Sequence, residues 1–150
     1  MKLVIQRVSQ ASVIANGEDR GQISQGLVVL LGVAEMDTVQ DVDWLVNKLV
    51  NMRVFNDEEG RMNHSLLDVD GELVVVSQFT LQASTKKGHR PSYIAAAKHD
   101  IAIPLYEDFV AKSSELIHKP VVTGVFGADM QVSIVNDGPV TIVIDSKNRT

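Results

Sequence analysis

One stretch decides the fold: Glu72-Leu73-Val74-Val75-Val76-Ser77-Gln78-Phe79-Thr80-Leu81, in which an apolar run passes directly into polar side chains. Short apolar runs rich in β-branched residues are typical of strands that are buried on both faces. The run therefore predicts a central strand of a covered sheet. The polar residues that follow mark its end, where the last backbone N–H groups lose their ladder partners.

The sequence before this strand predicts an antiparallel sheet and one helix. β-Rich runs occupy residues 3–5, 11–15 and 27–33, and Asn16-Gly17 between two of them is a strong hairpin-turn signal. Asp37 or Thr38 can cap a helix, because the apolar residues that follow recur at helical spacing: Val39, Val42, Leu45, Val46, Leu49 and Val50. We expect this helix to cover one face of the sheet.

The sequence after the central strand predicts two more helices and a closing hairpin. The helices are expected over 92–98 and 104–118, after a polar stretch at 84–91. Alternating apolar residues around 130–134 and 140–144 predict two strands joined by a turn at Asn136-Asp137-Gly138-Pro139. Residues 1–150 thus predict a single compact, β-rich α/β domain whose curved or barrel-like sheet carries about three covering helices.

Composition narrows the possible chemistry. The 150 residues are 45% hydrophobic, which is enough for one core, and they include no cysteine, so disulfides, thiolate metal sites and cysteine nucleophiles are excluded. The opening MKLVIQRVSQ is too polar for a signal peptide or a membrane span, and we expect a cytoplasmic protein. A formal charge of -5 argues against nucleic-acid binding through the overall field, but it allows a local basic patch.

Two segments are candidates for a reactive site. Ser77, Gln78 and Thr80 lie at a strand end, where unpaired N–H groups can hold an oxyanion, although such residues also simply terminate strands. Gly138-Pro139 forms a stiff turn that exposes carbonyl groups and can adopt the cis isomer, but it also fits an ordinary hairpin loop.

Other features are weaker. The four histidines lie in separate segments without a metal motif, and serine-hydrolase elbows and phosphate-binding loops are missing, so we expect no metal and no cofactor. The densest basic cluster is Lys86-Lys87-Gly88-His89-Arg90, with Lys98 and His99 downstream, which suits phosphate contact but also a solvated loop. On pattern alone, Phe126 and Met130 are core residues.

Two motifs, Ser77-Gln78-Phe79-Thr80 and Asn136-Asp137-Gly138-Pro139-Val140-Thr141, resemble the SQFT and NXGPVT signatures of the D-aminoacyl-tRNA deacylases. The similarity extends over essentially the whole chain, from 4–8 through 87–92 to 126–130. It implies hydrolysis of the ester between a D-amino acid, or mischarged glycine, and the 3′-terminal adenosine of tRNA. No cofactor is implied.

The resemblance also implies roles for particular residues. The catalytic set is Ser77, Gln78, Phe79 and Thr80, with backbone N–H groups at 79 and 80 near the scissile carbonyl. Gly138 and Pro139, joined by a cis peptide, enter the active site of the partner in a homodimer and exclude L-amino acids. The rest of the substrate pocket is assigned to Phe126, Ala128 and Met130, and tRNA contact is assigned to Lys86, Lys87 and Arg90.

Alternatives remain open at this point. In the family, water is activated with help from the ribose 2′-hydroxyl, which agrees with the lack of an obvious base beside Thr80. A threonine-nucleophile hydrolase of small esters is a second possibility, with Thr80 as the attacking group. A non-catalytic RNA-binding module is the third, because the sequence has no visible acid/base pair.

Overall fold

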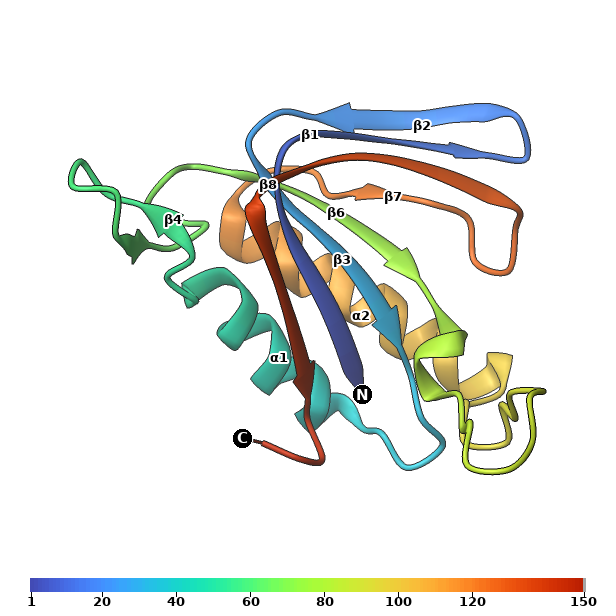
Figure 1. Ribbon diagram of the computed structural model, residues 1–150. Coiled ribbons are helices and arrows are strands. Elements are labelled where there is room, and N and C mark those ends of the chain that lie inside the picture. The colour runs from blue at the N-terminus through green and yellow to red at the C-terminus, as the bar shows by residue number, and fades with distance from the viewer. Residues whose placement is uncertain (150) are drawn as a thin grey trace.

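The computed structural model describes residues 1–149 and consists of a strongly bent sheet packed against two helices (Figure 1). The sheet contains β1 (Lys2–Ala15), β2 (Glu18–Ile23), β3 (Gly26–Gly32), β6 (Glu72–Ser77), β7 (Val122–Thr123) and β8 (Met130–Asp145). The helices are α1 (Val39–Asn51), α2 (His99–Ile117) and the 3₁₀ turn η1 (Phe79–Gln82). A separate small ribbon is formed by β4 (Phe55–Asn56) and β5 (Met62–His64).

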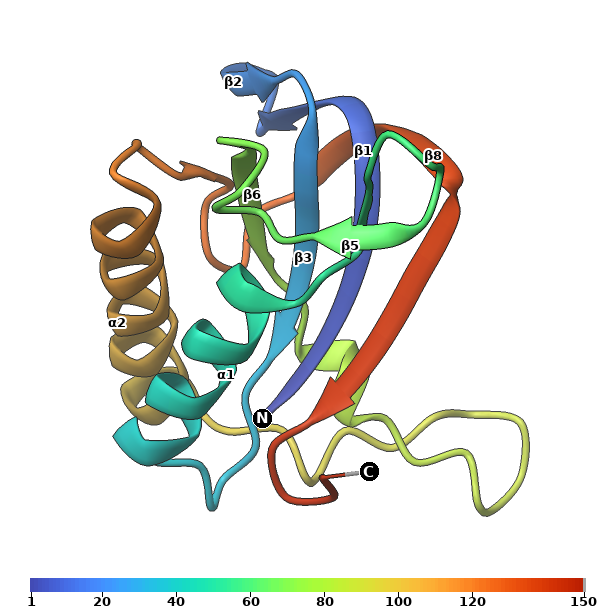
Figure 2. The same cartoon turned by 90° about the vertical axis from the view of Figure 1, so that its left-hand side faces the viewer.

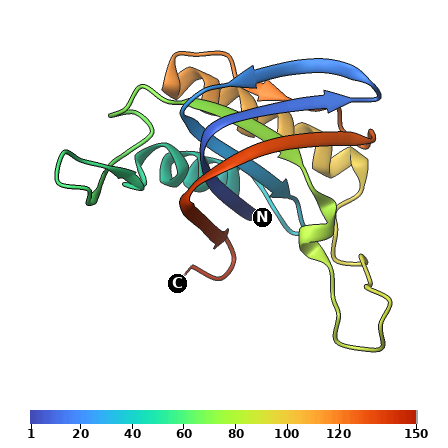
Figure 3. The ribbon, with the colours of Figure 1, turned by 45° about the horizontal axis from the view of Figure 1, so that its top comes forward.

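The sheet curls until it nearly closes. Its order is β2-β1-β3-β6-β7, with β8 along the other side of β1, and β3, β6 and β7 run parallel to one another. The two ends of this order meet, because a Cβ added to Gly21 of β2 would lie 3.3 Å from Val122 of β7. The curl can be followed in Figure 3. The predicted barrel-like α/β domain is confirmed.

Side-chain alternation along the central strands creates two cores. In β3 and β6 one set of residues faces the helices, and it includes Leu27, Val29, Leu31, Leu73 and Val75. The intervening set, with Val28, Val74 and Val76, fills the inside of the curled sheet. Both sets are almost fully buried, which explains why the central strand reads as continuously apolar. Figure 2 shows α1 and α2 on the same face of the sheet.

Helix α1 begins where the sequence predicts it. Thr38 is the N-cap and forms a capping box with Asp41, whose carboxylate accepts a 2.8 Å bond from the Thr38 N–H. None of the helices among residues 1–149 is long and apolar enough to cross a membrane.

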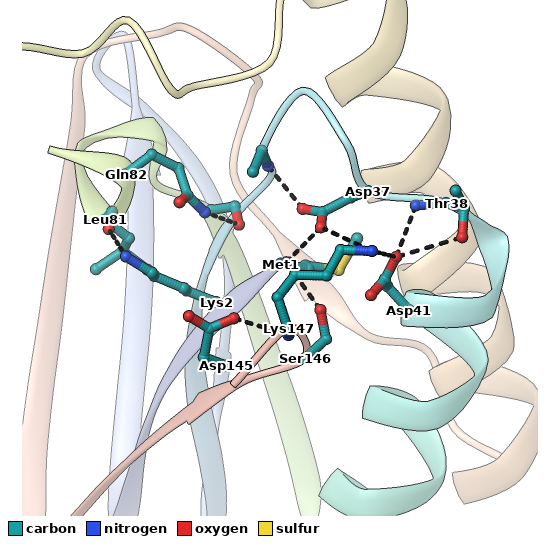
Figure 4. A network of polar contacts seen from close by, with 12 residues as sticks. Met1, Lys2, Asp37, Thr38, Asp41, Leu81, Gln82, Asp145, Ser146 and Lys147 are labelled. Atoms are coloured by element: carbon teal, nitrogen blue, oxygen red, sulfur yellow. Dashed lines mark hydrogen bonds and ion pairs between the residues drawn. The ribbon is translucent and has the colours of Figure 1, made fainter. Parts of the chain in front are cut away.

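The other cap candidate, Asp37, instead joins the two ends of the described chain. Its carboxylate lies 2.6 Å from the amino group of Met1, which also donates to Ser146 at 2.9 Å. Lys147 completes the cluster through a 2.8 Å ion pair with Asp41 (Figure 4). We call these five residues the terminal clasp. It fixes the start of β1, the end of β8 and the start of α1 together.

The helix predicted over 92–98 is absent. That segment is irregular: it has an isolated bridge between Ser84 and Ser92, a turn closed by the bond from the Ala96 N–H to the Tyr93 carbonyl, and a bond from the Ala97 N–H to the Val33 carbonyl. Pairing with distant backbone has overridden the local helix propensity of its alanines. The following helix begins at His99 instead of Pro104, so Pro104 lies inside it and two α-helices cover the sheet instead of three.

The predicted C-terminal hairpin is also wrong. β8 runs from Met130 to Asp145 without reversing direction and pairs antiparallel with β1 on both sides of an irregular stretch. Between the pairs Gln6↔Thr141 and Val8↔Asn136, β1 contributes only Arg7, whereas β8 contributes residues 137–140. Asn136-Asp137-Gly138-Pro139 is therefore part of a bulge in one strand, where a proline needs no ladder partner.

Candidate active site

A pocket of about 750 Å³ opens at the end of β6, inside the curl of the sheet and beside η1. Six of the predicted site residues line it: Ser77, Gln78, Phe79, Phe126, Ala128 and Met130. The first three come from the end of the central strand, and the others come from the segment that leads into β8. Folding thus brings together two groups that lie about fifty residues apart in the sequence.

The floor of the pocket is shaped by the way β6 ends. The Gln78 N–H donates to Leu31 O at 2.7 Å, which extends the pairing with β3 by one bond, and the chain then turns into η1. Phe79 and Thr80 are the first two residues of this turn, so the turn itself provides no carbonyl group to accept a hydrogen bond from their N–H groups. Thr80 does not line the pocket, and its hydroxyl accepts a hydrogen bond from the Gln78 amide.

The opposite wall is built around Phe126. Its ring packs edge to face against His99, with centroids 5.4 Å apart, and against Tyr106 at 6.0 Å. The Tyr106 hydroxyl donates to Val75 O at 2.8 Å, and burial raises the pKa of this group to about 12, so it remains a donor. Tyr106 therefore joins α2 to the central strand behind the pocket. Phe126 is both a core residue and a pocket residue.

Sequence reasoning did not assign Lys98 and His99 to the pocket, although both line it. Both residues follow the basic cluster in the sequence, but their place depends on the non-helical segment at 92–97, where a helix was predicted. No carboxylate is among the residues that line the pocket in the described chain, so these two side chains give its rim a basic character.

The tRNA-contact candidates Lys86, Lys87 and Arg90 do not line the pocket. All three are exposed on a loop whose base is closed by the Ser84–Ser92 bridge. The loop projects from the body of the protein at the end where η1 lies (Figures 1 and 2). Phe79 and Tyr93 pack edge to face at 5.2 Å, so the base of the loop contacts the pocket lip.

Gly138 and Pro139 are joined by a cis peptide bond and are both exposed. They do not line the pocket of their own chain. Figure 1 shows the bend of β8 near β4, at the end of the sheet opposite η1. One chain alone therefore does not bring the two signature motifs together.

Arg7 supports this bulge from beneath. It is 6% exposed, and its Nε donates to Asp137 O at 3.2 Å. A second guanidinium nitrogen, Nη1, donates to Val54 O at 2.7 Å and to Asn56 Oδ1 at 3.2 Å. The guanidinium thus ties the bulge to the residues around β4. Among residues 1–149, no three His, Cys, Asp or Glu side chains gather where they could hold a metal ion.

Comparison with known proteins agrees with these motifs. Residues 4–145 match the family model described as D-Tyr-tRNA(Tyr) deacylase. A D-aminoacyl-tRNA deacylase from Flavobacterium johnsoniae is 58% identical over 149 residues, and one from Bacteroides fragilis strain YCH46 is 56% identical, each match covering 99% of both chains.

Two solved structures share the fold. A protein described as c-Myc DNA Unwinding Element Binding Protein matches with a TM-score of 0.91 and 41% identity, covering 97% of this chain and 98% of its own. A probable eukaryotic D-amino acid tRNA deacylase matches with a TM-score of 0.83 and 16% identity, covering 95% and 97%. The pocket with its SQFT strand end, the bulged Gly-Pro motif and the whole-length matches lead to one conclusion: this chain belongs to the D-Tyr-tRNA(Tyr) deacylase family.

Proposed function

We propose that this chain acts as a homodimer that hydrolyses the ester between a D-amino acid and the 3′-terminal adenosine of tRNA, in sites built by two subunits. D-Aminoacyl-tRNA deacylation is the activity of its family. The observation that carries the two-chain site is the separation of the motifs, because the exposed Gly138-Pro139 bulge lies away from the pocket of its own chain. A second copy would supply it.

The floor of the pocket is suited to ester hydrolysis. Attack on the ester carbonyl creates an oxyanion, which the N–H groups of Phe79 and Thr80 would stabilise. Ser77 and Gln78 would orient the substrate beside them. Because these donors are backbone groups held by the fold, little reorganisation is needed as the charge develops.

Water is the proposed nucleophile, activated with help from the ribose 2′-hydroxyl of the substrate. The contacts of Thr80 support this route: within residues 1–149 its hydroxyl is hydrogen-bonded to the Gln78 amide, and an amide NH₂ group can only donate. The Gln78 amide nitrogen therefore cannot act as a base that takes the Thr80 proton. Replacement of Thr80 by alanine should leave single-turnover hydrolysis near normal. The nucleophile route would instead be supported if Thr80→Ala lost activity and an acyl-enzyme could be trapped in the unaltered protein.

The Gly138-Pro139 bulge would select the chirality of the substrate. Its carbonyl groups would approach the substrate α-carbon so closely that a hydrogen fits and an L side chain does not. D-aminoacyl and glycyl esters would therefore both be accepted. The anchoring of the bulge by buried Arg7 supports this role, because exclusion by contact requires a backbone that cannot move aside.

Contact with the tRNA body is assigned to the projecting basic loop. Lys86, Lys87 and Arg90 are exposed beside the pocket lip, where phosphates of the acceptor end would pass. The net charge of -5 means that attraction to RNA must be local to this part of the surface.

A subunit-mixing experiment tests the two-chain site. One variant carries Gly138→Ala and Pro139→Ala, and the other carries Ser77→Ala and Gln78→Ala in an otherwise normal chain. Each homodimer should be impaired, whereas mixing and re-equilibrating them places an intact floor opposite an intact bulge in half of the dimers. Activity should then recover to about a quarter of the normal value. No recovery despite confirmed heterodimers would contradict the proposal.

The alternatives predict different substrate preferences. A small-ester hydrolase would cleave D-tyrosine ethyl ester as fast as D-Tyr-tRNA, whereas the proposed enzyme should prefer the tRNA ester because the small ester lacks the 2′-hydroxyl and the phosphates. A binding module would retain tRNA without hydrolysing it.

A further inference from the structure

The turn η1 has little structure of its own to hold it. It is a single turn of four residues, whose flanking hydrogen bonds run from Leu81 N to Gln78 O at 3.2 Å and from Ala83 N to Thr80 O at 3.0 Å. A single turn of this kind is marginal by itself. Oxyanion donors must nevertheless be held within about 0.5 Å of the productive position. The restraint on this turn must therefore come from its neighbours.

Strand β3 provides that restraint at both ends of the turn. At the start, the Gln78 N–H donates to Leu31 O at 2.7 Å. At the end, the Gln82 side-chain amide donates to Gly32 O, also at 2.7 Å. Gln82 is only 7% exposed, so this hydrogen bond is shielded from water. Consecutive residues of β3 thus hold the two ends of η1.

The turn lies directly on the backbone of Gly32. A Cβ at this position would be 2.8 Å from Gln78 O and 2.8 Å from the Leu81 Cβ, which is closer than real Cβ contacts. The lack of a side chain at Gly32 lets the turn approach close enough for the Gln82 amide to reach its carbonyl.

Lys2 adds a second tie at the same end. Its Nζ donates to Leu81 O at 3.3 Å, so a cation lies at the last carbonyls of the turn. The preceding residue, Met1, is anchored in the terminal clasp by its 2.6 Å contact with Asp37. Figure 4 shows Lys2 reaching Leu81 from β1, with Gln82 of the same turn next to it and the terminal clasp nearby.

We propose that Gln82 is a positioning residue for the hydrolysis: its amide holds η1 against Gly32 and thereby places the Phe79 and Thr80 N–H groups. Lys2 supports the same end of the turn. This inference rests on the proposed function of those N–H groups. Gln82 lies outside the SQFT motif and does not line the pocket, so it acts through the turn and not on the substrate.

The test replaces Gln82 by methionine, which fills a similar volume but cannot donate. For D-Tyr-tRNA, kcat should fall about tenfold or more while KM stays within about twofold, because small displacements of reacting groups are costly and substrate contacts are retained. The preference for D- over L-tyrosine should persist, because it resides in Gly138-Pro139. A Val46→Ala variant serves as the control, since it weakens the helix-side core far from the turn.

The outcomes distinguish a wrong role for Gln82 from a wrong proposed function. Loss of kcat in Gln82→Met but not in a control of equal thermal stability supports the inference. An unchanged kcat, or an equal loss in both variants, overturns it. If Gln82→Met does not fold, Lys2→Met should lower kcat about threefold and Lys2→Arg should restore it; no change in Lys2→Met would then overturn the inference. Failure of the unaltered protein to hydrolyse D-Tyr-tRNA would instead reject the proposed function.

Discussion

At the scale of single residues, Arg7 has the largest set of contacts relevant to function. The guanidinium is buried, and it connects the bulge at Asp137 to the carbonyl of Val54 and the amide of Asn56. An arginine presents several donors in one rigid plane, so it can fix three partners at once where a lysine cannot. The position of the proposed chiral selector thus depends on a residue 130 positions away in the sequence.

Replacing Arg7 by methionine should therefore weaken chiral selection as well as stability. Hydrogen bonds to a charged group contribute about 1.5–3 kcal/mol, so the free energy of unfolding should fall by about that amount. The ratio of D- to L-Tyr-tRNA hydrolysis should fall by about tenfold, because a looser bulge tolerates a side chain. Asp137→Asn is the comparison variant, since it removes only the 3.2 Å ion pair between the Asp137 carboxylate and Arg7 Nε and keeps the backbone carbonyl that Arg7 contacts, so it should lower the ratio less than Arg7→Met. An unchanged ratio in Arg7→Met would show that the bulge is held by other means.

At the scale of elements, sequence reasoning succeeded where the pattern is local. The hairpin at Asn16-Gly17 is confirmed, with φ of 50° and 79° at these two residues, as the first strand turns into the second. Helix α1 was predicted from its apolar spacing and its cap, and the strand at Leu73–Val76 from its continuous apolar run. In each case propensity and tertiary packing favour the same structure.

The wrong predictions concern segments whose conformation is set by hydrogen bonds to backbone that is distant in the sequence. Residues 92–98 are not helical because Val33 and Ser84 supply hydrogen-bond partners, and no local pattern reveals them. The Gly138-Pro139 turn looks like a hairpin, but β1 pairs with both flanking segments, so the chain bulges instead of reversing. The same distant pairing explains why Lys98 and His99 were not assigned to the pocket. Phe79, Phe126, Ala128 and Met130 were assigned through family resemblance rather than local pattern.

The terminal clasp carries a prediction about pH. Burial alone would raise the pKa of the Asp41 carboxyl, but hydrogen bonds from Lys147, Ser146 and the Thr38 backbone outweigh this effect and hold the pKa well below its usual value. A carboxyl whose pKa is lowered by folding stabilises the protein above its unfolded pKa, about 3.9, and this contribution is lost as the pH falls further.

Asp41→Asn should thus lower the free energy of unfolding by about 1–3 kcal/mol at pH 7. The difference between the two proteins should shrink as the pH falls from 4 to 2. Denaturant unfolding of both proteins across this range measures the effect. Because the two proteins share all other titrating groups, the difference in their free energies of unfolding isolates the contribution of Asp41. A difference that stays constant with pH would contradict the assigned charge interaction.

At the scale of the whole molecule, charge distribution and subunit arrangement matter together. The chain is acidic overall, yet the pocket rim and the neighbouring loop are basic. A polyanionic substrate would therefore be repelled by most of the surface and attracted at one end, which favours a single approach of the acceptor stem.

Substitution of Lys86 and Lys87 by alanine tests the approach of the tRNA. KM for D-Tyr-tRNA should rise about three- to tenfold with kcat nearly unchanged. The slope of the logarithm of the binding constant against the logarithm of the salt concentration should become shallower by about 1 for each lost phosphate contact, and so by about 1–2 for the double variant. Lys48→Ala, on α1 and outside this loop, is the control and should have no effect. A variant with normal salt dependence would remove this loop from the tRNA interface.

We propose that this protein hydrolyses D-aminoacyl-tRNA and rejects the L form by contact with the Gly138-Pro139 bulge. Initial hydrolysis rates of matched D-Tyr-tRNA and L-Tyr-tRNA, with a chelator present throughout, test it directly. We expect rapid release of D-tyrosine, negligible release of L-tyrosine, and a weakened preference when Gly138 and Pro139 are both replaced. Equal inertness toward both substrates, or equal hydrolysis of both, would contradict it.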